Sequence, residues 1–151
     1  MKAYQQFLHR APEQGGLNFW VNFLQQGHTV EQMQAGIVGS REYFQSRGGA
    51  TNNGFLTALY QDALGRAVDN SGQTTFTTQL NGGVTTGQVA SAVFASSEFQ
   101  QDLVQADYAL FLNRGADAAG LAAFTSALRQ GQTDQQIAAA IAASDELFAG
   151  V

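Results

Sequence analysis

Three copies of one residue pattern follow one another along the chain, and this repetition restricts the fold more than any other feature. With Tyr4, Tyr60 and Tyr108 in register, no gap is needed inside any copy. The aligned columns are Tyr4, Tyr60 and Tyr108; Arg10, Arg66 and Arg114; Gly16, Gly72 and Gly120; Trp20, Phe76 and Phe124; Leu24, Leu80 and Leu128; Gly27, Gly83 and Gly131; Thr29, Thr85 and Thr133; Gln32, Gln88 and Gln136; Ser40, Ser96 and Ser144; and Glu42, Glu98 and Glu146. Such a pattern is typical of tandem supersecondary units that pack against one another.

The spacing of the copies predicts the domain organisation. It is 56 residues from Tyr4 to Tyr60 and 48 residues from Tyr60 to Tyr108, and the additional eight are rich in residues that favour turns. The predicted segments are repeat one at 1–46, a connector at 47–54, repeat two at 55–100 and repeat three at 101–151. Repeat one lacks most of the helical sequence that precedes Tyr60 and Tyr108. We therefore expect it to be truncated and the sequence to be a fragment of a longer protein.

Each repeat is predicted to contain three helices. In the first helix of repeat three, apolar residues recur at helical spacing as Val104, Tyr108, Phe111 and Leu112. Gly65 is the expected end of the same helix in repeat two. The second helix follows an acidic residue that we expect to be its N-cap, and these residues are Glu13, Asp69 and Asp117.

The third helix has the clearest signal, because each copy begins with a capping box of the form Thr-x-x-Gln. The boxes begin at Thr29, Thr85 and Thr133. An apolar pair follows each box, as Met33 and Ile37, Val89 and Val93, and Ile137 and Ile141. No segment alternates in the manner of a strand. The predicted fold class is all-α, with tandem three-helix units packed into one helical domain.

The composition excludes several kinds of site. The chain has no cysteine, so disulfides, thiolate metal sites and cysteine nucleophiles are ruled out. Seven basic and twelve acidic residues give a net charge of −5, which disfavours a broad electrostatic interaction with nucleic acid or an anionic membrane. The sequence has no apolar run long enough for a transmembrane helix and no visible signal peptide.

Charged residues are scarce, and many of them fall in three repeated columns. These columns are Arg10, Arg66 and Arg114; Glu13, Asp69 and Asp117; and Glu42, Glu98 and Glu146. Residues at the same place in every repeat serve something that every repeat needs, which is folding. We therefore expect each arginine to anchor a helix C-terminus or to pair with an acidic residue of its repeat. The alternative is that the columns line a ligand groove.

Other residues that could bind a ligand or take part in a reaction also have a structural interpretation. Trp20 shares its column with two phenylalanines, so we expect it in the core; the alternative is that its ring stacks on a sugar. His9 and His28 belong to no repeated column and are expected at the surface. The segment 69–72 faintly resembles a calcium loop but lacks the alternating oxygen ligands, so a helix cap is expected and calcium is the one cofactor left open. No nucleotide-binding, hydrolase or metalloprotease motif occurs, so we expect no enzymatic activity.

The pattern resembles a known family. Tyr60-x3-Leu64-Gly65-Arg66-x2-Asp69-x2-Gly72, with Leu80-x2-Gly83 and Ser96-x-Glu98-Phe99 behind it, is similar to the repeat of the bacterial domain-of-unknown-function family DUF4214. The likeness covers almost the whole chain. His9 and Asn113 stand where repeat two has Gly65, which indicates a helix terminator rather than a ligand site.

The resemblance implies a class of function rather than an activity. Such repeats look like those of secreted or surface proteins of bacteria, including surface-layer proteins, large exoproteins and adhesins, and they resemble the helical linker domains of phycobilisomes. We therefore expect a non-catalytic structural or interaction module of a secreted or cell-surface protein that mediates assembly or anchoring. Its expected partners are other protein domains or copies of itself. The alternative is a ligand-binding module for surface glycan or for calcium-dependent attachment.

Overall fold

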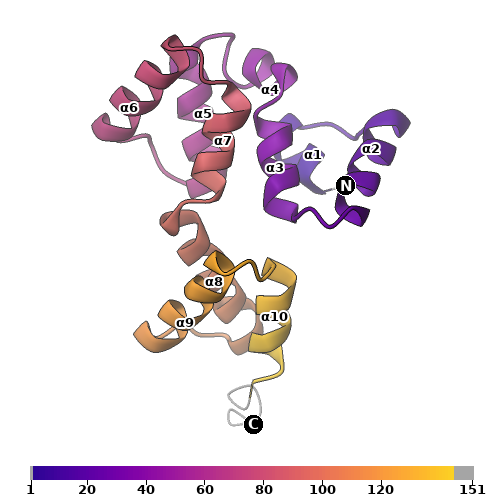
Figure 1. Cartoon of the computed structure of the whole chain (residues 1–151), viewed down its shortest axis with the longest axis vertical. Coiled ribbons are helices and arrows are strands. Elements are labelled where there is room, and N and C mark those ends of the chain that lie inside the picture. Colours follow the sequence, from indigo (N-terminus) through magenta and orange to yellow (C-terminus); the bar gives the residue numbers. More distant parts are fainter. Residues whose placement is uncertain (1, 145–151) are drawn as a thin grey trace. The chain divides into compact units, whose positions relative to one another are not determined.

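Helices joined by turns and short loops make up the part of the chain that the structure describes. A computed structural model describes residues 2–144, and in this range it has ten α-helices and no strand (Figure 1). The predicted all-α class is confirmed. The chain divides into two compact units, Met1–Ala95 and Ser96–Val151, which differs from the one helical domain that we expected. The two units are described separately below.

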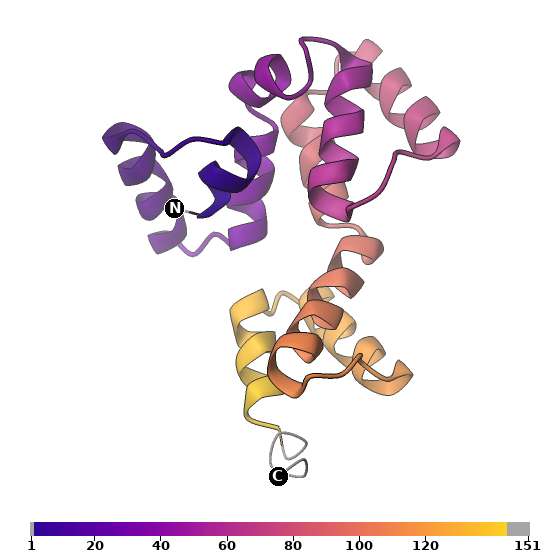
Figure 2. The same ribbon diagram turned by 180° about the vertical axis from the view of Figure 1, so that it is seen from behind.

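The N-terminal unit contains repeats one and two. Its helices are α1 (Lys2–Leu8), α2 (Gln14–Gln25), α3 (Val30–Val38), α4 (Arg41–Ser46), α5 (Asn52–Leu64), α6 (Asn70–Asn81) and α7 (Thr86–Phe94). The closest association is between α3 and α7, the third helices of the two repeats, which lie side by side in Figures 1 and 2. At one end of this pair, a Cβ on Gly39 would overlap the Cα of Gly87. At the C-terminal end of α7, the ring of Phe94 meets the ring of Phe7 from α1 edge to face at 6.1 Å. Small residues and aromatic residues together therefore join the two repeats.

The C-terminal unit contains repeat three. Its helices are α8 (Ser97–Leu112), α9 (Ala118–Arg129) and α10 (Asp134–Ala142), and each contacts the other two. Val104, Tyr108, Ile137 and Ile141 form its buried core. The predicted apolar pairs of the third helices are buried in all three repeats, which confirms that expectation.

The eight-residue insertion divides one helix into two. Where repeats two and three are joined by the single helix α8, repeats one and two are joined by α4, a turn at 47–51 and α5. The Thr51 hydroxyl accepts a hydrogen bond from the Gly54 amide at 3.0 Å and caps α5. The predicted connector 47–54 therefore includes the first turn of α5. The predicted boundary at residues 100 and 101 lies inside α8.

Helix capping follows the sequence pattern with one exception. All three predicted capping boxes are confirmed. Asp69 and Asp117 also cap their helices as predicted, because their carboxylates accept from the amides of Gly72 and Gly120 at 2.8 and 2.7 Å. The same prediction is wrong for Glu13, which makes no side-chain cap hydrogen bond. Its longer side chain turns instead to an arginine, described below.

The first helix of each repeat ends at a residue in the left-handed region. The φ angle is +64° at Gly65, +53° at His9 and +50° at Asn113. The predicted role of Gly65 as a helix terminator is confirmed. Because this conformation is strained for residues with a Cβ atom, His9 and Asn113 fill the position at a cost in stability.

Candidate functional site

The repeated arginine lies over the repeated tyrosine in every copy. The guanidinium carbon is 5.2 Å from the ring centre for Arg10 over Tyr4, and 5.1 Å for both Arg66 over Tyr60 and Arg114 over Tyr108. In each copy the guanidinium Nη1 also donates to the carbonyl of the next residue at 2.9 Å. A cation–π contact and a backbone hydrogen bond thus hold the loop after the first helix against that helix.

Acidic residues of the repeated columns complete this cluster in repeats one and two. Arg10 contacts Glu13 at 2.5 Å and Glu42 at 2.6 Å. Arg66 contacts Asp69 at 3.1 Å. The hydrogen bonds from Arg10 lower the pKa of Glu42. The pKa of Asp69 is lowered first by the amide of Gly72 and then by Arg66.

The remaining predicted residues of these columns are placed as follows. In repeat three, Arg114 binds the Gly115 carbonyl and Asp117 caps α9. Glu98 lies in the first turn of α8, as Glu42 does in α4. Glu146 lies outside the described residues. The three arginines, Glu13, Glu42, Asp69 and Asp117 thus contact helix ends, loops or one another.

The repeated glycine has a role that the sequence analysis did not assign. A Cβ atom on Gly16 would lie 2.8 Å from the hydroxyl oxygen of Tyr4, and a Cβ on Gly72 would lie 2.5 Å from that of Tyr60. A Cβ on Gly120 would overlap the hydroxyl of Tyr108. The tyrosine and the glycine therefore form one packing unit. Because glycine has no side chain, the second helix can lie directly against the tyrosine of the first.

Trp20 belongs to the same packing unit and is not a free ring. Its indole Nε1 donates to the Tyr4 hydroxyl at 3.1 Å. A Cβ on Gly36 would lie 2.5 Å from the Trp20 ring, so the indole lies directly against α3. The matching Phe76 has no N–H to donate and meets the Tyr60 ring edge to face, with ring centres 6.4 Å apart. The structure places Trp20 between helices, whereas the alternative expectation was a ring that stacks on a sugar.

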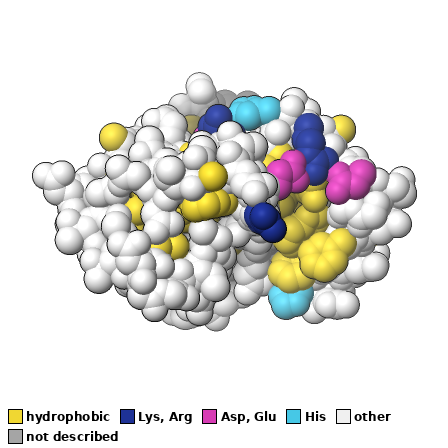
Figure 3. Space-filling model, turned by 90° about the horizontal axis from the view of Figure 1, so that it is seen from above, with side chains coloured by type: hydrophobic (Ala, Val, Ile, Leu, Met, Phe, Trp, Pro, Cys, Tyr) yellow, Lys and Arg dark blue, Asp and Glu magenta, His cyan; other side chains and the backbone are white. Residues whose placement is uncertain are grey.

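A different set of aromatic residues is exposed on α2. Phe19 is 59% exposed, although it is a large hydrophobic residue, and Phe23 is partly exposed. Figure 3 shows hydrophobic side chains gathered at the surface of the N-terminal unit beside a histidine. Phe19 and Phe23 are not among the predicted site residues, because those predictions rest on residues that recur in every repeat. The informative feature was that Phe19 and Phe23 do not recur, since neither has an aromatic counterpart in the other two repeats.

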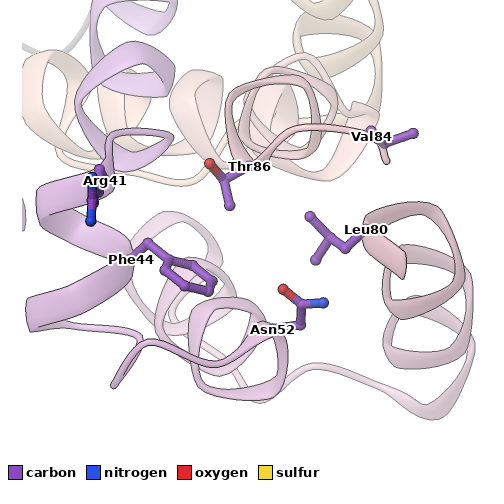
Figure 4. A pocket seen from close by; sticks show the side chains of 6 residues that line it. All are labelled: Arg41, Phe44, Asn52, Leu80, Val84 and Thr86. Carbon is purple, nitrogen blue, oxygen red and sulfur yellow. The ribbon is translucent and has the colours of Figure 1, made fainter. Parts of the chain in front are cut away.

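An open cleft of about 290 Å³ lies elsewhere in the N-terminal unit. Figure 4 shows Phe44, Thr86, Leu80 and Asn52 around its opening, with Arg41 at one end and Val84 at the other. Thr86 is already engaged, because its hydroxyl donates to the Gly39 carbonyl at 2.7 Å. Arg41 is the one ionisable side chain in this lining.

A buried polar cluster lies at the junction of α4 and α5. The hydroxyl of Tyr43, a fully buried residue, donates to Asp62 at 2.7 Å. Arg47 pairs with the same carboxylate at 2.9 Å, and the Asp62 side chain is 13% exposed. Burial, followed by the Asp62 carboxylate, raises the pKa of Tyr43. Tyr43 is therefore a neutral hydrogen-bond donor that fixes the turn before α5.

Repeat three has an acidic residue where repeat two has a core leucine. Asp107 corresponds to Leu59, which is fully buried. Burial raises the pKa of Asp107, and a hydrogen bond with Asp134 acts in the other direction. One carboxylate oxygen of Asp107 is buried without a hydrogen-bond partner. The residue therefore weakens the packing of α8 rather than strengthening it.

Within residues 2–144 no three His, Asp or Glu side chains come together as a metal site would need. Within the same range, no helix has the length and apolar character to cross a membrane.

Comparison with known proteins identifies the repeat. The model of the domain of unknown function DUF4214 matches residues 2–47, 38–103 and 100–150. No curated protein and no solved structure matches the chain. The three matched segments together cover nearly the whole sequence and follow the three copies found in it. The chain therefore belongs to the DUF4214 family and contains this domain of unknown function in three tandem units.

Proposed function

We propose that the protein is a non-catalytic attachment module of a secreted or cell-surface bacterial protein. The observation that supports this proposal best is the exposed aromatic surface of α2, where Phe19 is 59% exposed. An exposed aromatic group costs solubility and contributes little to the fold, so its natural role is contact with a partner.

The use of the ionisable residues supports the non-catalytic part of the proposal. Arg10, Glu13 and Glu42 bind one another, and Asp69 caps a helix while it binds Arg66. Ion pairs and a helix cap within their own repeat stabilise these groups in their charged states. A catalytic acid or base requires a pKa tuned toward the working pH, which these contacts oppose.

The extracellular part of the proposal rests on the sequence. The chain has no cysteine and few charged residues, and its repeats resemble those of bacterial surface proteins. Under this proposal the three units form a helical spacer, and α2 supplies the contact with the surface to which the parent protein attaches.

Binding to intact bacterial cells tests the proposal. The fluorescently labelled chain is mixed with Gram-negative or Gram-positive cells and bound protein is measured by flow cytometry. We expect saturable binding that Phe19→Ala weakens and that Thr75→Ala, the equivalent exposed position of repeat two, leaves unchanged. Binding that requires calcium would favour the calcium-dependent alternative, and no saturable binding to either cell type would contradict the proposal.

A further inference from the structure

The aromatic residues of α2 are not required by the fold of the repeat. Phe19 corresponds to Thr75 in repeat two and Ala123 in repeat three, and both of these are exposed. Phe23 corresponds to Gln79 and Ala127. Since the other repeats fold without these rings, the rings serve something that only repeat one does.

The rings form an ordered row rather than a loose group. Phe19 and Phe23 are nearly parallel, with an interplanar angle of 20° and centres 6.4 Å apart. His28 stacks on Phe23 at 3.9 Å with an angle of 11°. Trp20 meets Phe19 and Phe23 edge to face at 4.8 and 5.3 Å and supports both from the interior side. Because these contacts hold the rings in place, a ligand that binds them loses little side-chain entropy on the protein.

The helix leaves space beside the Phe19 ring. A helical side chain lies over the turn that precedes it, which for Phe19 is the turn that contains Gly15. A Cβ atom on Gly15 would meet no atom within 4 Å. The corresponding residues of the other repeats, Ser71 and Ala119, do have side chains. Repeat one therefore has an exposed ring at Phe19 and, one helical turn before it, an open position whose Cβ would lie more than 4 Å from any atom of that ring.

The polar residues of α2 near the rings are uncharged, while Figure 3 shows charged side chains beside the hydrophobic ones. Asn18, Asn22 and Gln26 are exposed on or just after α2, and α2 contains no charged residue. Amide side chains both donate and accept hydrogen bonds, which is what hydroxyl groups require. The C–H face of a sugar ring in turn is apolar and packs on the face of an aromatic ring. The absence of a cation on α2 and the net charge of −5 disfavour an anionic ligand such as a nucleic acid or an acidic polysaccharide.

We propose that Phe19 and Phe23 form a platform that binds a neutral glycan whose sugars present flat C–H faces, such as a β-1,4-linked chain of glucose or N-acetylglucosamine. This inference rests on the proposed attachment function and names the chemical class of its ligand. Phe19 supplies the stacking face, Phe23 supports the Phe19 ring while His28 covers a face of Phe23, and the neighbouring amides bind the hydroxyl or acetamido groups. Trp20 holds the two rings in place without facing the ligand.

Trp20 also makes the proposal directly measurable. It is the single tryptophan of the chain and contacts both rings, so its fluorescence reports ligand on the platform. Cellohexaose and chitohexaose are titrated into the full chain, and the titration is repeated by calorimetry. We expect saturable binding to at least one of them. Phe19→Ala and Phe23→Ala should each weaken it at least about fivefold, while Thr75→Ala has no effect.

Two further variants separate binding from folding. Gly15→Gln places a side chain beside Phe19 and replaces a helical glycine, so it should weaken sugar binding while the melting temperature stays the same or rises. The double variant Thr75→Phe with Gln79→Phe builds the ring pair in repeat two, and we expect an additional, weaker sugar site. If Phe19→Ala or Phe23→Ala lowers the melting temperature markedly, Gly15→Gln still tests the platform.

The outcomes distinguish this inference from the broader proposal. If neither sugar binds but cells still bind and Phe19→Ala weakens that binding, the glycan platform is overturned while the attachment function stands. If ultracentrifugation shows that the chain self-associates and that Phe19→Ala abolishes this, the surface joins copies of the chain, and the glycan platform is again overturned. Failure of both sugar binding and cell binding would remove both proposals.

Discussion

The hydroxyl oxygen of Tyr60 lies 2.5 Å from the position that a Cβ atom on Gly72 would occupy. The same relationship joins Tyr4 to Gly16 and Tyr108 to Gly120. Two of the repeated columns are thus explained by a single contact between the first and second helices.

Gly72→Ala should therefore lower the free energy of unfolding by about 1–3 kcal/mol, because the new methyl group would displace the tyrosine ring. Urea unfolding measures the change. Tyr60→Phe combined with Gly72→Ala should recover part of the loss, since the hydroxyl makes the closest approach. Gly87→Ala is the control, because its Cβ would meet nothing closer than 3.8 Å. Equal effects of Gly72→Ala and Gly87→Ala would contradict the contact.

Asp62→Ala should destabilise the N-terminal unit by about 2–4 kcal/mol. The substitution leaves the buried Tyr43 hydroxyl without its acceptor and Arg47 without its partner. Tyr43→Phe should cost less than Asp62→Ala, and the double variant should cost less than the sum of the two. Gln61→Ala, at an exposed position of the same helix, is the control. Additive losses would show that Tyr43 and Asp62 do not act together.

Asp107→Leu should stabilise the C-terminal unit by about 1 kcal/mol at neutral pH. It removes a carboxylate oxygen that is buried without a partner, and it restores the residue type that repeat two has at Leu59. Thermal unfolding of the full chain measures the change. A destabilised variant would show that the Asp107 carboxylate is well accommodated.

Asp107 should also affect the pH dependence of stability. The pKa of Asp107 is raised in the folded state. Its favourable contribution to the free energy of unfolding is therefore complete below its pKa in the unfolded chain, about 3.9, and is lost as the pH rises through its pKa in the folded chain. Glu42 and Asp69 act with the opposite sign, because their lowered pKa values give stability that is lost as the pH falls. The difference in unfolding free energy between Asp107→Asn and the native chain should therefore grow from pH 4 to pH 7. A constant difference would contradict the raised pKa.

His9→Gly should raise the stability of repeat one by about 1 kcal/mol. His9 has a φ angle of +53°, which glycine adopts without the strain of a Cβ atom. The reverse change in repeat two, Gly65→Ala, should lower stability by a similar amount, because Gly65 has a φ angle of +64°. A melting temperature that does not change with either substitution would show that the helix ends relax freely.

The local elements of this fold could be predicted from the sequence because their signals lie within a few residues. Thr29 and Gln32 are three residues apart, and each provides the other's hydrogen-bond partner. Gly65 ends a helix through its own φ angle. Such features depend on the backbone nearby and not on the rest of the molecule.

Contacts between helices could not be predicted in the same way. The Tyr60–Gly72 contact and the Tyr43–Asp62 hydrogen bond depend on how two helices approach, which spacing alone does not give. Glu13 shows a competition that the sequence leaves undecided, since the carboxylate binds Arg10 instead of capping α2. The exposed Phe19 was missed because a search for recurrence overlooks whatever occurs once.

The broken helix between repeats one and two has a consequence for how this chain unfolds. Repeats one and two, joined by α4, a turn and α5, share one compact unit, whereas the unbroken α8 begins the unit that holds repeat three. We therefore expect repeats one and two to melt together and repeat three to melt in a separate transition, which calorimetry would resolve as two peaks.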